Sequence, residues 1–224
     1  MVEVEVIIEV PQGSRNKYEM DHASGRIRLD RMLFTSTRYP LDYGFIPGTL
    51  AEDGDPRDAM VMLGEPAFPG CSVTARPIGV FWMHDEHGPD AKILAGPARD
   101  PRYADLRDTG DVPDHLCCEI SQFFDIYKEL EPEKSTGVRG WQDLAAAEQV
   151  ITGALAARRR PARQSVPFGT GRAARIAATQ AAHELRADGV AAAALFKPGL
   201  GGWIVQIFPG GIRQAARRGA NGRR

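Results

Sequence analysis

Three carboxylates lie within six positions of the chain, in the stretch "EDGDPRDAM". Asp53, Asp55 and Asp58 must either repel one another or share a cation. Gly54 and Pro56 between them favour a sharply bent backbone. Mg²⁺ prefers oxygen ligands in octahedral geometry and usually keeps several water ligands. The spacing therefore predicts a metal-binding turn, in which Asp53 and Asp58 face one ion and Asp55 reaches bound water.

Two other acidic motifs fit this turn poorly. A calcium-binding EF-hand loop beginning at Asp53 would need Asp or Asn at position 57 and Glu at position 64, where the chain has Arg57 and Gly64. The nucleophilic aspartate of a phosphatase would directly follow a buried strand, and "GTLAE" before Asp53 is a poor strand. Both interpretations are set aside in favour of a hard divalent cation.

A second acidic turn, "HDEHGPDAK", contains Asp85, Glu86 and Asp90 and is followed by Lys92 on an expected strand. Taken alone, it is typical of a solvated hairpin tip. If both turns lie at one end of a barrel, their carboxylates would hold two or more metal ions about 3.5–4 Å apart, a geometry suited to displacement at phosphorus. The two turns together therefore indicate phosphorus chemistry.

Basic residues border the same elements. Lys17, Arg31, Lys92 and Lys128 are far apart in the sequence, but each lies beside an expected strand or helix. Isolated Lys and Arg side chains are usually solvated. They become candidate anion ligands only if the fold gathers them around one cavity.

The elements that must position these residues are short strands followed by helices. Strand-like alternation covers residues 4–10 and 26–29, and apolar runs cover 59–63, 73–83 and 92–95. Turn sequences, among them "PQGSRNK" and "HASG", separate them at close intervals. This pattern predicts a barrel or a strongly curved sheet.

The hydrophobic period changes after Pro113. Asp114 is a candidate helix cap, and a second amphipathic helix is expected at about 142–157. In the first helix, apolar residues recur at three- and four-residue steps: Leu116, Ile120, Phe123, Phe124, Tyr127 and Leu130. Strands followed by helices predict an α+β fold that is mainly β.

Composition bounds the class of protein. The chain has 224 residues, 43% of them hydrophobic, and three cysteines, which supply neither a disulfide framework nor a zinc site with paired cysteines. No run approaches the 18 or so apolar residues of a membrane helix, and the opening "MVEVEVIIEVPQG" alternates instead of resembling a signal peptide. We expect a cytoplasmic protein with no membrane partner.

Charge divides the chain into two parts. Residues 1–157 carry 15 Lys and Arg against 27 Asp and Glu, a net −12, whereas residues 158–224 carry 13 against 2, a net +11. The second part is rich in Arg, Ala and Gly, and we expect a flexible or partly helical tail. Such a tail would bind nucleic acid by counterion release, or would be an extension that no partner recognises.

Four stretches, in this order, resemble the soluble family I inorganic pyrophosphatases: "IIEVPQGSRNKYE", "RLDRMLFTSTRYPLDYGFIPGTLAEDGDPRDAMVM", "ARPIGVFWMHDEHGPDAKILA" and "FFDIYKELEPEK". The resemblance covers about residues 2–150. Within the family, the chain is most like the bacterial members, in particular those of actinobacteria. The resemblance implies a five-stranded, OB-like closed β-barrel with two flanking α-helices. It also implies hydrolysis of inorganic pyrophosphate to two phosphates, with Mg²⁺ or with Mn²⁺ or Zn²⁺ as substitutes, in a homo-oligomer that is a hexamer.

The resemblance also implies roles for residues. It gives Asp55 as the general base, with Tyr43 and Lys128 completing the catalytic set, and His22 and His87 as accessory residues at the edge of the site. The implied metal ligands are Glu9, Asp53, Asp58, Asp85 and Asp90. The implied substrate ligands are Lys17, Arg31, Tyr43, Lys92, Tyr127 and Lys128.

Some positions depart from the family pattern, namely Gly96, Gln122 and 135–137. They would loosen packing near the helix while sparing the expected ligands. Two alternatives to an active enzyme stay open. One is an OB-like nucleic-acid-binding module that uses the basic tail, and the other is a catalytically impaired pyrophosphatase variant.

Overall fold

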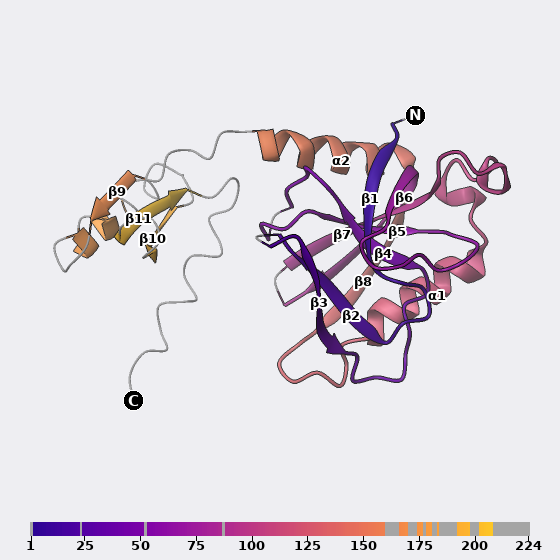
Figure 1. The fold of residues 1–224 in the computed structure, drawn as a ribbon, viewed down its shortest axis with the longest axis horizontal. Helices are drawn as coiled ribbons and strands as arrows, with labels where there is room; N and C mark the ends of the chain where they lie inside the picture. The colour runs from indigo at the N-terminus through magenta and orange to yellow at the C-terminus, as the bar shows by residue number, and fades with distance from the viewer. Residues whose placement is uncertain are drawn as a thin grey trace. The chain divides into compact units, whose positions relative to one another are not determined.

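The computed structural model divides the chain into two compact units, Met1–Arg158 and Arg159–Arg224, which are described separately (Figure 1). In the first unit the structure describes all residues except 1, 23, 52 and 87. In the second it describes residue 159 and the stretches 166–169, 174–176, 178–180, 183, 192–197 and 202–207. No helix among these residues has both the length and the apolar character needed to cross a membrane.

A closed sheet organises the first unit. In the described part of the chain, six strands pair in the order β1-β4-β5-β7-β6-β8, and β1 also pairs with β6, so that β1, β4, β5, β7 and β6 form a ring. Their bounds are β1 Val4–Val10, β4 Asp42–Ile46, β5 Arg57–Val61, β6 Ser72–Asp85, β7 Gly88–Pro97 and β8 Thr136–Gln142. Neighbouring strands are antiparallel except β5 and β7, which are parallel. The predicted five-stranded closed barrel is confirmed.

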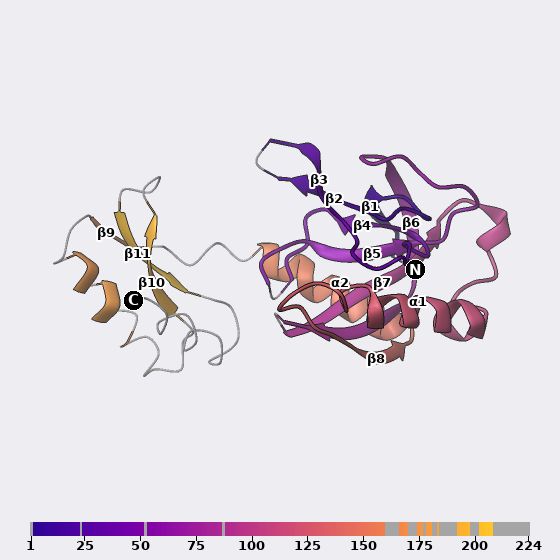
Figure 2. The same cartoon turned by 90° about the horizontal axis from the view of Figure 1, so that it is seen from below.

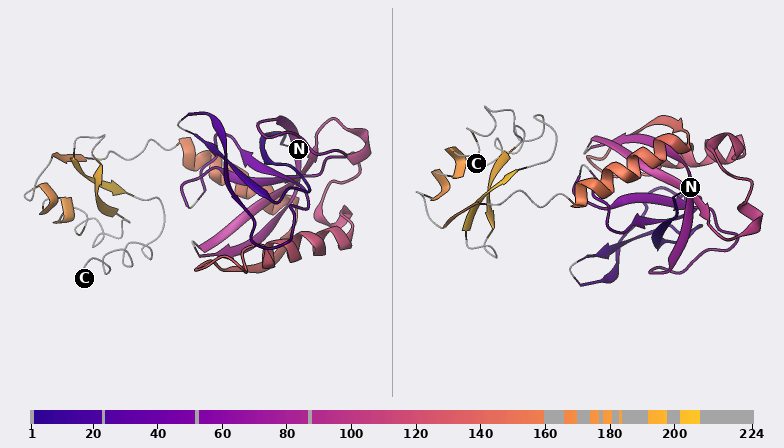
Figure 3. Two further views of the ribbon diagram at one scale, coloured as in Figure 1. Left: turned by 60° about the horizontal axis from the view of Figure 1, so that its bottom comes forward. Right: turned by 90° about the horizontal axis from the view of Figure 1, so that it is seen from above.

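Side chains on the two faces of this sheet belong to two different hydrophobic clusters. Because successive residues of a strand point to opposite faces, Met60 belongs to one cluster and its neighbour Ala59 to the other. The first cluster includes Phe124 of α1 (Asp114–Ile126), and the second includes Ile151 of α2 (Leu144–Arg159). Both predicted helices therefore pack on the sheet, and Figure 3 shows α2 running along the barrel.

Two details of the first helix were predicted wrongly. Pro113 occupies the N-cap position of α1, and Asp114 lies in the first turn, where its carboxylate still favours the positive end of the helix dipole. The helix ends at Ile126, so Leu130 lies beyond it and is exposed.

A two-stranded hairpin, β2 (Asn16–Asp21) and β3 (Arg26–Met32), projects from the barrel (Figure 2). Its strands pair with a register shift next to Lys17 and Arg31, which are Cα partners. Part of β2 had been predicted as a turn. Two 3-10 turns, η1 (Pro101–Tyr103) and η2 (Thr109–Asp111), lie in the connection from β7 to α1.

The second unit contains an antiparallel sheet that the sequence prediction for 158–224 did not include. Among its described residues, strands β9 (Val166–Gly169), β10 (Ala192–Lys197) and β11 (Gly202–Ile207) pair in the order β10-β11-β9. Residues 174–176 and 178–180 are helical.

Two glycines that depart from the family pattern have other side chains packed against them. A Cβ at Gly137 would lie 2.1 Å from Cε1 of His84, so the histidine ring already fills the space that a side chain would need. A Cβ at Gly96 would lie 3.5 Å from atoms of Ile78 and Tyr103, which is normal van der Waals contact. Neither glycine therefore leaves a cavity, and the structure shows no loosened packing at these two positions.

Candidate active site

A cavity of about 430 Å³ in the first unit gathers the residues singled out in the sequence. Every predicted site residue lines it except His87, which lies outside the described residues. The predicted residues that line it are Glu9, Lys17, His22, Arg31, Tyr43, Asp53, Asp55, Asp58, Asp85, Asp90, Lys92, Tyr127 and Lys128. The two acidic turns therefore do open on one site.

Lys92, which is 2% exposed on β7, links three of these side chains. Its Nζ donates hydrogen bonds to Asp58 at 2.8 Å, to Asp90 at 2.9 Å and to the Tyr43 hydroxyl at 2.8 Å. Tyr43 in turn donates to Asp58. Burial alone would lower the pKa of Lys92, but the facing carboxylates raise it, so the amine stays protonated.

Lys128 connects the segment after α1 to the end of β6. Its Nζ donates to Asp85 at 3.0 Å and to both oxygens of Glu86 at 3.3 Å. The neighbouring Tyr127 is buried, and burial raises the pKa of its hydroxyl. The phenol therefore keeps its proton at neutral pH and can donate a hydrogen bond without adding charge.

Carboxylates on the other side of the cavity experience one another's charge. Burial, together with repulsion from Asp58, raises the pKa of Glu9 to about 7, although its Oε1 accepts a 2.6 Å hydrogen bond from the Met20 amide. Burial also raises the pKa of Asp53, and the charges of Asp55 and Asp58 add to the effect. Asp53 accepts from the Asp55 amide at 3.0 Å, which fixes the turn. Over the cavity as a whole, the lining carboxylates outnumber the lining Lys and Arg side chains.

The β2–β3 hairpin contributes two cations to the cavity, and each of them pairs with an acidic side chain of the same hairpin. Lys17 Nζ pairs with Glu19 and lies 3.7 Å from Asp30. Arg31 pairs with Asp30 and donates through Nε to Glu131 at 2.9 Å. His22 lies at the edge of the cavity, with its ring 5.0 Å from the ring of Phe45 in a T-shaped contact.

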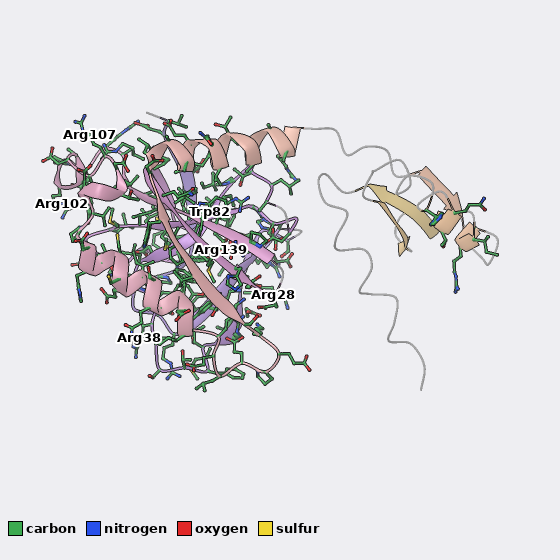
Figure 4. All side chains as sticks on the ribbon, turned by 180° about the vertical axis from the view of Figure 1, so that it is seen from behind. Arg28, Arg38, Trp82, Arg102, Arg107 and Arg139 are labelled. Atoms are coloured by element: carbon green, nitrogen blue, oxygen red, sulfur yellow. The ribbon has the colours of Figure 1, made fainter. Side chains whose placement is uncertain are left out.

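Other arginines of the first unit lie away from this cavity. Arg28, Arg38, Arg102, Arg107 and Arg139 are exposed, and Figure 4 shows them on the surface of the unit. Among the described residues, none of the five lines the cavity. Only some of the basic residues of the first unit therefore line the cavity, and these five arginines are not among them.

The donor set fits a hard divalent cation that keeps water ligands. Among the described residues, no three His, Cys, Asp or Glu side chains are close enough together to hold an ion by themselves. Lys92 Nζ occupies one oxygen of Asp58 and one oxygen of Asp90. Mg²⁺ is commonly bound by one or two carboxylates, water and substrate phosphate, and this requirement matches the all-oxygen donors present.

Sequence reasoning missed several residues of the site. Glu86 was noted in the second acidic turn but given no role, and Glu131 is a buried carboxylate behind the cavity wall. Both occur within stretches that carry the family resemblance, but neither spacing nor residue type distinguishes them there. The further lining residues are Glu19, Met20, Asp30, Tyr39, Phe45, Pro56, Phe124 and Lys134.

Known proteins match the first unit. A family model described as "Inorganic pyrophosphatase" matches residues 6–159. The inorganic pyrophosphatase of Streptomyces coelicolor is 55% identical over 150 residues, covering 67% of this chain and 92% of that protein. That of Leifsonia xyli is 49% identical over 156 residues, covering 70% and 96%.

Solved structures agree with these sequence matches. The crystal structure of inorganic pyrophosphatase from Thermus thermophilus superposes with a TM-score of 0.69 at 46% identity, covering 70% of this chain and 91% of that one. Residues 6–159, which the family model matches, include every residue that lines the cavity. Taken with the barrel and the gathered carboxylates, these findings show that the chain belongs to the inorganic pyrophosphatase family.

Proposed function

We propose that the cavity hydrolyses inorganic pyrophosphate to two phosphates with Mg²⁺, using the residues gathered around Lys92. The observation that carries this proposal is the presence, in one cavity, of the two acidic turns and of amines and phenols from four separate segments. Pyrophosphate carries several negative charges, so its hydrolysis requires neutralisation and positioning more than covalent chemistry by the protein.

The family is metal-dependent, and Mg²⁺ is the ion that this donor set suits best. Two or more ions would be held, each by one or two carboxylates, and the side chains that would hold them are Glu9, Asp53, Asp58, Asp85 and Asp90. When bound, the ion supplies positive charge to the phosphoryl oxygens and lowers the pKa of the attacking water. Mn²⁺ and Zn²⁺ are expected substitutes because carboxylates accept them too.

The chain's own residues bind and orient the substrate. Lys17, Arg31, Lys92 and Lys128 place positive charge around the two phosphoryl groups. Tyr43, which touches both Lys92 and Asp58, donates to a phosphate oxygen without adding charge. Tyr127 does the same from the segment after α1.

Asp55 is proposed to accept the proton of the attacking water. It lines the cavity two residues from Asp53 and three from Asp58, within the turn that presents those carboxylates. Because its backbone amide is hydrogen-bonded to Asp53, its position relative to this turn is fixed. A carboxylate held near the attacking water can take up the proton that the water loses.

Phosphate release from pyrophosphate by the full-length protein tests the proposal. Activity should require Mg²⁺, disappear with a chelator and fall by at least about a hundredfold in Asp58→Asn, as expected when a charged group is removed from such a site. Asp100→Asn removes a carboxylate that pairs with Arg102 outside the cavity and should leave the rate unchanged. Undiminished turnover with chelator or in Asp58→Asn would refute the proposal.

The division of the chain is also a proposal. Residues 1–157 form the pyrophosphatase domain, and residues 158–224 are a basic extension that is not needed for the chemistry. Two findings support this: the family model matches residues 6–159, and the matches to two relatives span 96% and 92% of those proteins but only 70% and 67% of this chain. Equal kcat for the full-length and truncated proteins is expected, and inactive truncated protein that is still folded would contradict it.

By resemblance to bacterial members, the assembly is proposed to be a hexamer and the compartment the cytoplasm. Light scattering of the purified full-length chain measures the mass of the assembly directly. A monomeric mass at the concentration of the activity assay would refute the hexamer and leave the catalytic proposal standing.

A further inference from the structure

A buried carboxylate that was not predicted as a site residue pairs with two cations that line the cavity. Glu131 is 5% exposed, and its Oε1 accepts from Arg31 Nε at 2.9 Å while its Oε2 accepts from Lys134 Nζ at 2.8 Å. Arg31 and Lys134 both line the cavity, and Glu131 does not appear among the described residues that line it. The Glu131 carboxylate therefore binds one cavity-lining cation with each of its two oxygens, although it does not itself line the cavity.

Arg31 uses only one of its three nitrogens for Glu131, so two remain for other partners. Arg31 uses Nε for Glu131 and Nη1 for Asp30. Its Nη2 is buried and has no hydrogen-bond partner among the described residues. A guanidinium held through Nε and Nη1 has a fixed plane, and its Nη2 is the nitrogen left to donate to a phosphate oxygen.

The turn that carries Glu131 is itself fixed. The Glu131 amide donates to the Lys128 carbonyl at 2.8 Å, and the Lys134 amide donates to the Glu131 carbonyl at 3.3 Å. Between them, Glu133 has φ of 62°, the one non-glycine residue with a positive φ in the described part of the chain. A left-handed conformation of this kind persists only where the surroundings enforce it, and such positions cluster at functional sites.

We propose that Glu131 is a positioning residue for pyrophosphate hydrolysis, because its buried carboxylate aims Arg31 and Lys134 at the cavity. This inference rests on the proposed function, and in particular on the contact of Arg31 with substrate. Burial alone would raise the pKa of Glu131, but hydrogen bonds from Lys134 and Arg31 lower it, so the acid is ionised where the enzyme works. Glu131 also joins the β2–β3 hairpin to the segment after α1, which are 100 residues apart.

Steady-state kinetics with pyrophosphate on the full-length protein tests this role. Glutamine has one acceptor oxygen and one amide donor, so Glu131→Gln cannot accept from both cations. KM should rise roughly 10- to 100-fold, the range for a lost charge-assisted hydrogen bond, with a smaller change in kcat. Asp100→Asn, which unpairs Arg102 outside the cavity, is the matched control and should not change KM.

A double-variant cycle separates positioning from simple loss of stability. If Glu131 acts through Arg31, then KM of Arg31→Gln with Glu131→Gln should rise by clearly less than the product of the two single effects. Should Glu131→Gln not fold, Glu131→Asp keeps the charge but cannot reach both cations, and its KM should also rise.

Three results from the Glu131 variants would overturn the inference. They are an unchanged KM in a folded Glu131 variant, a double variant whose effect equals the product of the singles, and a fall in kcat alone. If Arg31→Gln itself leaves KM unchanged, the proposed substrate contact of Arg31 is wrong and the inference falls with it. If only Glu131→Gln leaves it unchanged, the proposed function stands and the positioning role fails.

Discussion

Gly44 lies where the barrel leaves no room for a side chain. It is the Cα partner of Ile8 across the β1–β4 pair, next to a register shift in β1. A Cβ at this position would lie 1.8 Å from the Ile7 carbonyl oxygen and 2.9 Å from the Ile8 Cα, which are backbone atoms. Unlike a side chain, these atoms cannot rotate away, so Gly44→Ala must separate the two strands.

The size of the effect follows from that separation. Moving the strands apart by about 1 Å stretches hydrogen bonds of normal length beyond bonding range, and two lost ladder bonds cost about 1 kcal/mol each. Overpacking of the surrounding core adds roughly 1–3 kcal/mol. Gly44→Ala should therefore lower the free energy of unfolding by about 3–5 kcal/mol, a large share of the 5–15 kcal/mol typical of a domain.

Urea unfolding of the full-length protein measures this change, with Gly153→Ala as the matched control. Gly153 is exposed in α2, and a Cβ there would meet nothing within 4 Å. The same substitution at Gly153 should raise the free energy of unfolding by about 0.5–1 kcal/mol, the helix-propensity difference between Gly and Ala. Gly44→Ala within about 1 kcal/mol of wild type, at an unchanged slope against urea, would show that the strands adjust and that the reasoning is wrong.

Two further predictions concern single residues. Glu133→Val should lower the free energy of unfolding by about 1 kcal/mol, because β-branched residues resist positive φ, whereas Glu133→Gly should not lower it. Thermal unfolding of both variants decides, and equal melting temperatures would contradict the prediction. Burial raises the pKa of Asp42, so its ionisation destabilises the folded state, and stability falls as the pH rises from the unfolded value of about 4 through the higher folded value. Asp42→Asn avoids this loss, so its Tm minus that of wild type should increase between about pH 3 and 7; a constant difference would exclude the effect.

Burial alone does not decide which strands the sequence predicts, because β4 ("DYGFI") is buried throughout and was not predicted, whereas β3 is mostly exposed and was predicted in part. The apolar runs of β5, β6 and β7 were found because their side chains enter the two hydrophobic clusters. Part of β2 was taken for a turn because "NKYEMD" has no apolar alternation, and its residues are only partly buried or exposed. Backbone pairing with β3 holds this strand, and such pairing leaves little trace in residue type.

The candidate site shows a similar division. Residue types and short spacing were enough to find the acidic turns, because the ligands of one turn are neighbours in sequence. The contact between Arg31 and Glu131 joins segments 100 residues apart, so no spacing rule predicts it. Lys134 likewise became a candidate only when the structure placed it on the cavity.

Lys92 shows why stability and chemistry cannot be separated at the centre of this site. Its amine lies 5.2 Å from the centroids of the Tyr43 and Phe124 rings, so its surroundings belong to the core as much as to the cavity. Its charge is balanced by Asp58 and Asp90, whose side chains are 31% and 24% exposed against 3% for the lysine. Removing one partner of a buried ion pair typically costs about 3–5 kcal/mol, because the other charge is left uncompensated. A loss of activity on replacing Lys92 therefore identifies a substrate contact only when the variant's unfolding free energy has been measured, whereas the more exposed Lys17 reports on substrate binding with less interference from folding.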